Sequence, residues 1–118
     1  MGYSTPDVYY QPEKFDLTIV GEIEQEPCYS FDKLVVWQHA DGRLFYADDH
    51  GCSCPSPFEN YTSLESPGEP ITPQTWDAFE EYVMDFGYDG DPPLADKNEL
   101  INEVRGRVRA QERVSLPA

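Results

Sequence analysis

The sequence predicts an α+β fold: a small antiparallel sheet of three or four strands within residues 8–58, packed with two helices at residues 72–86 and 96–113. Three observations predict it. Apolar and polar residues alternate in the first half of the chain, which is typical of half-buried strands. An Asp-Gly pair separates two such stretches, as in a hairpin. In the second half, apolar residues recur every three or four positions, as on one helix face.

The first strand is expected at residues 15–24, with one face in the core and the other face acidic and in water. Its apolar face would consist of Phe15, Leu17, Ile19, Gly21 and Ile23. The second strand, residues 29–38, is apolar on both faces, so both should be covered. One face would carry Phe31, Val35 and Trp37, and the other Leu34 and Val36.

The hairpin turn is expected at residues 39–43, after which residues 44–47 resume the strand pattern. Two prolines in residues 50–57 should end the strand pairing or leave an edge. Residues 62–71 are rich in Pro, Ser and Gly, and they predict a connector between the sheet and the helices. We expect residues 1–118 to form a single domain with a flexible tail at residues 114–118.

Thr72 is expected to cap the first helix, with Pro73 in its first turn. The apolar face of this helix would be Trp76, Phe79, Val83 and Phe86, and Gly87 would end it. Asp96 is expected to open the second helix, with Glu99 completing a capping box. The narrow apolar stripe of this helix is Leu100, Val104 and Val108. This stripe could pack beside the sheet or pair two copies in a weak homodimer; otherwise the protein would be a monomer.

The composition bounds the class of protein. The 118 residues are 39% hydrophobic and 14% aromatic, which suffices for the core of one domain. The sequence contains no apolar run of 18 residues, and its first residues lack the basic and apolar stretches of a signal peptide. An odd count of three cysteines argues against a secreted disulfide framework. We therefore expect a soluble protein of the cytoplasm.

The charge is the most informative feature. The formal net charge is −15, and residues 1–96 hold 20 acids against three bases. Such a chain is unsuited to binding nucleic acid or anionic membranes directly, and it favours a basic protein partner. The candidate contact residues are the acids of the first helix and of the turn after it: Asp77, Glu80, Glu81, Asp85, Asp89 and Asp91. These acids could mimic nucleic acid in the basic groove of a nucleic-acid-binding protein, or they could merely keep the protein in solution.

A second constellation could hold zinc. In an extended strand His50, Cys52 and Cys54 point to one side, and Cys28 is a conceivable fourth ligand. Their spacing does not match paired Cys-x-x-Cys knuckles, and free cysteines are commonly small buried apolar residues. A metal-stabilised structural or interaction module is therefore the alternative hypothesis, and the leading one needs no cofactor. A cysteine nucleophile with His50 as its base is disfavoured because residues this close in sequence rarely adopt that geometry.

Arginines follow one line of the second helix, at Arg105, Arg109 and Arg113. They could pair with the acids of the same chain, which we consider the simpler reading, or bind phosphate or an acidic partner.

Four segments resemble a known family: PDVYYQPEKF at residues 6–15, IVGEI at 19–23, VVW at 35–37 and ADDHGCSCPSPFE at 47–59. Together they resemble an uncharacterised domain family of small acidic proteins from actinobacteriophages, including mycobacteriophages. The resemblance is best over residues 6–64. It implies a phage accessory protein in the cytoplasm of a bacterial host, acting on a host protein in takeover or as an anti-defence inhibitor. The family brings no catalytic residues, so we expect no enzyme.

Overall fold

The computed structural model describes residues 9, 11–25, 30–52, 68–87 and 92–115, with side-chain detail at all of these except residues 25, 30, 31, 50–52 and 112–115. The elements are the 3-10 helix η1 (Pro12–Phe15), the strands β1 (Leu17–Gln25), β2 (Ser30–His39), β3 (Leu44–Cys52) and β4 (Glu69–Ile71), and the helices α1 (Trp76–Asp85) and α2 (Leu94–Ser115). The predicted α+β fold is confirmed.

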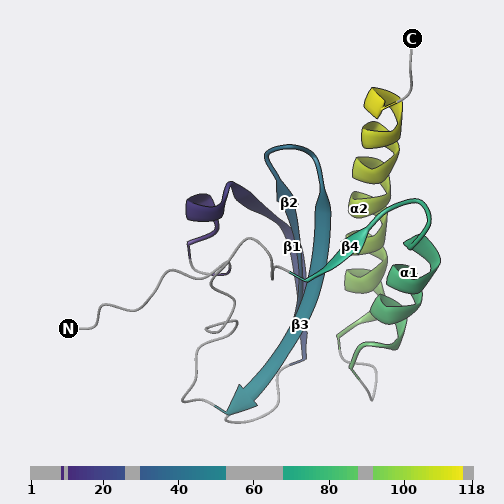
Figure 1. The fold of residues 1–118 in the computed structure, drawn as a ribbon. Coiled ribbons are helices and arrows are strands. Elements are labelled where there is room, and N and C mark those ends of the chain that lie inside the picture. Colours follow the sequence, from purple (N-terminus) through teal and green to yellow (C-terminus); the bar gives the residue numbers. More distant parts are fainter. Residues whose placement is uncertain (1–8, 10, 26–29, 53–67, 88–91, 116–118) are drawn as a thin grey trace.

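The sheet is antiparallel, with the strands in the order β1-β2-β3-β4. Both helices cover one face of it, and η1 lies on the other side (Figure 1). We call the face under the helices the helix face and the other the second face. Apolar side chains pack on both faces of the sheet.

A β-bulge in β1 changes which residues face the helices. Ile19 pairs with Trp37 and Gly21 pairs with the adjacent Val36, so Val20 is an extra residue in β1. Because successive side chains of a strand point to opposite faces, one extra residue reverses the alternation beyond it. Leu17 and Ile19 accordingly pack on the second face, whereas Val20 and Ile23 pack on the helix face. The expectation of one apolar and one acidic face was wrong for this strand.

The start of the first strand also differs from the expectation. Phe15 lies in η1, not in β1, and packs with Tyr9 and Ile19 against the second face. The buried residues of this second cluster are Leu17, Val35, Trp37 and Ala47. The two-sided burial expected for the second strand is confirmed, because Leu34 and Val36 are fully buried on the helix face and Val35 and Trp37 on the second face.

The β2–β3 hairpin is confirmed. The His39 N–H donates to the Arg43 carbonyl and the Gly42 N–H donates to the His39 carbonyl, both at 2.8 Å. Asp41 Oδ1 accepts the Arg43 N–H at 3.0 Å. Gly42 has a φ of 102°, a conformation that favours glycine. The Asp-Gly pair thus supplies both the side-chain acceptor and the backbone freedom that the turn needs.

The sheet extends further than expected at its other end. β3 runs past residues 44–47 to Cys52, which pairs with Ser30, so the pairing extends into the segment 50–57 ahead of its two prolines. The fourth strand comes from the stretch predicted as a connector, since residues 69–71 form β4 and pair with residues 44–46. The rest of the predicted connector, residues 62–67, lies outside the described residues, and Gly68 precedes β4.

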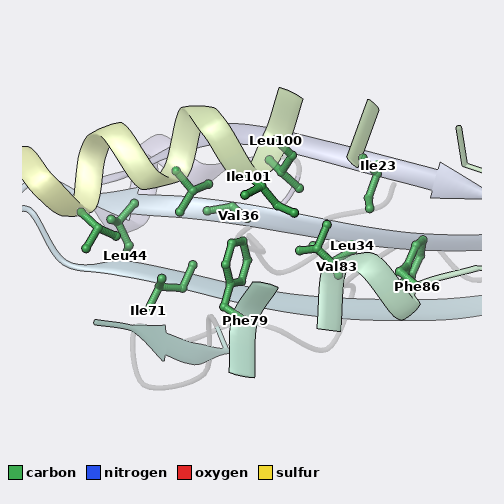
Figure 2. Close-up of a cluster of buried hydrophobic side chains, with 12 residues drawn as sticks. Ile23, Leu34, Val36, Leu44, Ile71, Phe79, Val83, Phe86, Leu100 and Ile101 are labelled. Atoms are coloured by element: carbon green, nitrogen blue, oxygen red, sulfur yellow. The ribbon is translucent and has the colours of Figure 1, made fainter. Parts of the chain in front are cut away.

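Helix α1 begins later than expected. The Thr75 N–H donates to Thr72 Oγ1 at 3.2 Å, and the Thr72 N–H donates to Thr75 Oγ1 at 2.9 Å. These reciprocal bonds close a turn before the helix, so Thr72 caps that turn and Thr75 stands at the N-cap. The predicted apolar face is confirmed: Phe79, Val83 and Phe86 are buried on the sheet, as Figure 2 shows, and Trp76 is half-buried at their edge. The helix ends at Asp85, and Gly87 follows with a φ of 78°.

Helix α2 is docked on the helix face through Leu100, Ile101, Val104 and Val108. The N–H groups of Asp96 and Lys97 donate to the Pro93 carbonyl at 3.0 and 3.2 Å, so the helix begins at Leu94 and Asp96 lies in its first turn instead of opening it. The helix includes Val114 and Ser115, which were expected in the tail. The predicted stripe is buried, together with Ile101, in the core shown in Figure 2. Because the sheet covers this stripe, the hypothesis that it pairs two copies was wrong.

Candidate functional site

The acids of α1 lie in two groups. Phe79 and Val83 are buried against the sheet, so they fix the orientation of the helix and hence the direction in which each acid points. Asp77, Glu81 and Asp85, spaced four residues apart, are exposed along one line of the helix. Glu80 lies elsewhere: its Oε2 accepts a hydrogen bond from Arg105 Nη2 of α2 at 3.1 Å. We call Asp77, Glu81 and Asp85 the acidic line. Asp89 and Asp91, which were predicted to extend it, lie outside the described residues.

The acidic line borders a hollow of about 560 Å³ between α1 and the sheet. Four carboxylates line it: Glu81 and Asp85 from α1, Asp32 from β2 and Asp48 from β3. Tyr82 and Phe86 add aromatic surface. We call this feature the acidic hollow.

Sequence reasoning missed Asp32 and Asp48, although a signal for them was present. Asp32 stands two and four residues before Leu34 and Val36, so the period of a strand places it on the same face as these core residues. Asp48 pairs with Leu34 across the β2–β3 ladder. What the sequence could not show is that α1 lies over this end of the sheet and joins its own acids to these two.

Tyr82 links the helix to the sheet at the acidic hollow. Its hydroxyl donates to Asp48 Oδ1 at 2.5 Å, and its ring centre lies 5.4 Å from that of Tyr46. Partial burial raises the pKa of Tyr82, and its hydrogen bond to the Asp48 carboxylate raises it further. Tyr82 therefore stays protonated and holds Asp48 in place while its ring adds an apolar wall.

Lys33 and Arg43 form ion pairs with acids that belong neither to the acidic line nor to the acidic hollow. Lys33 Nζ lies 2.9 Å from Glu24 Oε1 and 3.2 Å from Glu22 Oε1, and Tyr9 donates to the same Glu22 oxygen at 2.9 Å. Burial by itself would lower the pKa of Lys33, but hydrogen bonds with Glu24, Tyr9 and Glu22 outweigh it and raise the pKa. Arg43 pairs with Asp41 at 2.7 Å. These contacts neutralise acids of β1 and of the hairpin, away from the acidic line.

In the part of the chain that the structure describes, no Lys or Arg lines the acidic hollow, and no ion pair involves the acidic line. Carboxylates grouped beside aromatic rings are suited to ammonium and guanidinium groups, which gain from both the charge and the ring face. The arrangement can therefore accept Lys or Arg side chains of another molecule.

The zinc hypothesis concerns side chains that the structure leaves undescribed. Cys28 and Cys54 lie outside the described residues, and His50 and Cys52 are described only as backbone of β3. Among the side chains that are described, no three of His, Cys, Asp or Glu are placed so that they could hold a metal ion, and this includes the acidic hollow. The four-residue zinc site stays a prediction.

Within the described ranges, neither α1 nor α2 is long and apolar enough to cross a membrane. No curated protein and no solved structure shows significant similarity to the chain. The model of a domain of unknown function, DUF7574, matches residues 6–112, which includes all four strands and both helices up to the last turn of α2. By this match, the chain belongs to the DUF7574 family.

Proposed function

We propose that this protein is a non-enzymatic phage accessory protein that binds and modulates a basic host protein in the bacterial cytoplasm. The acidic line and the acidic hollow form the contact surface. One observation carries the proposal: three exposed carboxylates without ion pairs among the described residues stand beside a hollow with two further carboxylates and an aromatic wall. The resemblance to phage proteins supports the origin and the host.

The charge of the chain acts in two stages of this binding. At long range, the net charge of −15 attracts a basic partner and speeds association. At contact, Lys or Arg side chains of the partner enter the acidic hollow and meet Glu81, Asp85 and Asp48. Because exposed charges are screened over about 8 Å at physiological salt, binding should weaken as the salt concentration rises.

The modulation that best fits this surface is competition with nucleic acid. A protein that binds DNA or RNA presents clustered Lys and Arg to the phosphates, and a dense group of carboxylates can occupy the same residues. On this proposal, the bound host protein cannot hold its nucleic acid at the same time. A short DNA or RNA duplex should then displace the protein from its partner.

The test compares two variants with the same net charge. The first neutralises the acidic line, with Asp77→Asn, Glu81→Gln and Asp85→Asn. The control neutralises three exposed acids on other elements, with Glu13→Gln, Glu69→Gln and Glu99→Gln. Each changes the formal charge from −15 to −12, by three removed charges. Wild type and both variants are immobilised and used to capture proteins from a nuclease-treated actinobacterial lysate, and the captured partner is then titrated with each by calorimetry.

The first variant should lose affinity and the control should keep it. Exposed ion pairs contribute about 0.2–1 kcal/mol each, so three of them predict a loss of roughly 3- to 150-fold. Equal affinities for the two variants would show that overall charge, and not this surface, retains the partner. Absence of any partner that elutes in a salt step would contradict the proposal as a whole. Retention of the partner in the presence of excess duplex would contradict only the competition with nucleic acid.

A further inference from the structure

A second recess lies where α1 approaches α2, on the side of α1 that carries Glu80. It has a volume of about 210 Å³ and is lined by Pro73, Trp76, Arg105, Val108 and Arg109. We call it the Trp76 groove. Its lining combines an indole ring, a proline ring and valine methyl groups with two guanidinium groups, which is the opposite charge from the acidic hollow.

Arg105 is held in a fixed position in this groove. Its Nη2 donates to Glu80 Oε2 at 3.1 Å and its Nη1 donates to Asn102 Oδ1 at 3.3 Å. Its guanidinium carbon lies 5.4 Å from the centre of the Trp76 ring, within the range of a cation–π contact. A guanidinium carries five N–H donors, and these two bonds leave others for a ligand.

Arg109 lies one helical turn beyond Arg105 and is exposed. Among the described residues it has no ion pair or hydrogen bond. Two like charges four residues apart disfavour a helix slightly, and among the described side chains only the carboxylate of Glu80 pairs with either of these two arginines. Counted over these described side chains, two guanidinium groups and one carboxylate give the groove a net charge of +1. One carboxylate of a ligand would neutralise it.

We propose that the Trp76 groove binds an acidic side chain of a peptide segment in which apolar residues flank the acid. The net charge of the groove matches one carboxylate, and the neighbouring indole, proline and valine surfaces match apolar neighbours in the peptide. The volume of the groove is that of a side chain and not of a folded element. A phosphate group fits less well, because its charge of nearly −2 is repelled more strongly by a chain of net charge −15.

This inference is independent of the proposed function, because it concerns the opposite charge on the opposite side of α1. It gives the protein a second recognition surface. A chain that contacts a basic partner through the acidic line could hold an acidic segment of the same or another protein in the Trp76 groove.

The test uses the two tryptophans as reporters in one molecule. In nitrogen-15 NMR spectra, the indole N–H of Trp76 reports on the groove, and that of the fully buried Trp37 on the second face serves as an internal control. The probes are acetyl-Leu-Glu-Leu-amide, the same peptide with Gln in place of Glu, and inorganic phosphate, each titrated to about 10 mM. The acidic peptide should shift the Trp76 signal with saturation and leave Trp37 unmoved, whereas the Gln peptide should not shift it.

Two variants of equal charge complete the test. Arg109→Gln should weaken the acidic peptide at least about 5-fold, as loss of a charge-assisted hydrogen bond does. Arg43→Gln removes an exposed arginine of the hairpin and should leave the affinity unchanged. The proposal is overturned by any of three results: no saturable shift of Trp76, an equal shift with the Gln peptide, or an equal effect of the two variants. A stronger response to phosphate than to the peptide would also overturn it.

Discussion

Replacing Tyr82 by Phe should destabilise the protein and change its response to alkaline pH. Tyr82 donates to Asp48 at 2.5 Å, and 39% of its surface is exposed. A hydrogen bond to a charged acceptor contributes about 1.5–3 kcal/mol when buried, and exposure reduces this, so we expect Tyr82→Phe to cost about 1 kcal/mol at neutral pH. Phe keeps the ring contact with Tyr46, so packing should be little affected.

The sign of the pH effect follows from the direction of the pKa shift. Folding raises the pKa of Tyr82 above its ordinary value of 10.0. The stabilisation by the protonated tyrosine is therefore present below pH 10 and is lost as the pH rises from there toward the higher pKa of the folded state. At one pH unit above 10, deprotonation of a tyrosine that is buried in the folded state stabilises the unfolded state by about 1.4 kcal/mol relative to the folded state. Because Tyr82 is partly exposed, we expect about 1 kcal/mol or less here.

The assay is urea unfolding monitored by circular dichroism, at intervals between pH 7 and pH 11. The difference in unfolding free energy between wild type and Tyr82→Phe should be about 1 kcal/mol at pH 7 and should shrink toward zero by pH 11. Tyr46→Phe is the control for the hydrogen bond: burial and the charges of Glu69 and Asp48 raise the pKa of Tyr46 too, so this variant shares the direction of the alkaline response, but without a hydrogen bond to Asp48 it should cost less than Tyr82→Phe at pH 7. A difference between wild type and Tyr82→Phe that stays constant across this pH range would refute the reasoning.

Three further substitutions test the packing. Phe79→Ala removes a fully buried ring at the centre of the helix face and should cost about 3–5 kcal/mol, which thermal unfolding would detect as a fall in Tm; a loss below about 1 kcal/mol would contradict the core. Gly106→Ala should stabilise α2 by up to about 1 kcal/mol, because a Cβ there meets nothing within 4 Å; a lower Tm would be the contrary result. Gly68→Ala should cost at least about 2 kcal/mol, since Gly68 has a φ of 129° and a Cβ would overlap the Tyr46 carbonyl oxygen. Hydrogen exchange should then show lost protection between β3 and β4, and unchanged protection would contradict this pairing.

Local sequence patterns were sufficient wherever the nearest neighbours in the chain decide the structure. The β2–β3 turn needs an acceptor and a residue at positive φ, and Asp41 and Gly42 provide them side by side. The apolar face of α1 follows from the helical period, and Phe79 and Val83 are buried as expected. The acids of α1 were likewise identified in advance, although their grouping was not.

The elements that sequence analysis misplaced depend on partners far along the chain. The bulge at Val20 is a property of the β1–β2 ladder, and the sequence of β1 by itself does not show where the extra residue lies. β4 has only three residues, and it is a strand because it pairs with residues 44–46. Without that pairing, its Pro-rich surroundings indicated a loop. Thr72 carries the chemistry of a helix cap, yet its reciprocal bonds with Thr75 place it in the turn before α1.

The sequence by itself determined the fold class, the hairpin, the buried faces of β2 and α1 and the excess of negative charge, because periodicity, turn chemistry and composition are local or additive properties. Only the tertiary structure decided which acids act together. Packing α1 over the sheet brings Asp32 and Asp48 to Glu81 and Asp85, and packing α2 beside α1 pairs Glu80 with Arg105, whose guanidinium lies over the Trp76 ring. Electrostatic interactions depend on distance in space and on burial. The fold therefore places the acids of α1 in two different surroundings: Glu81 and Asp85 border the acidic hollow, whereas Glu80 lies beside the arginines of the Trp76 groove.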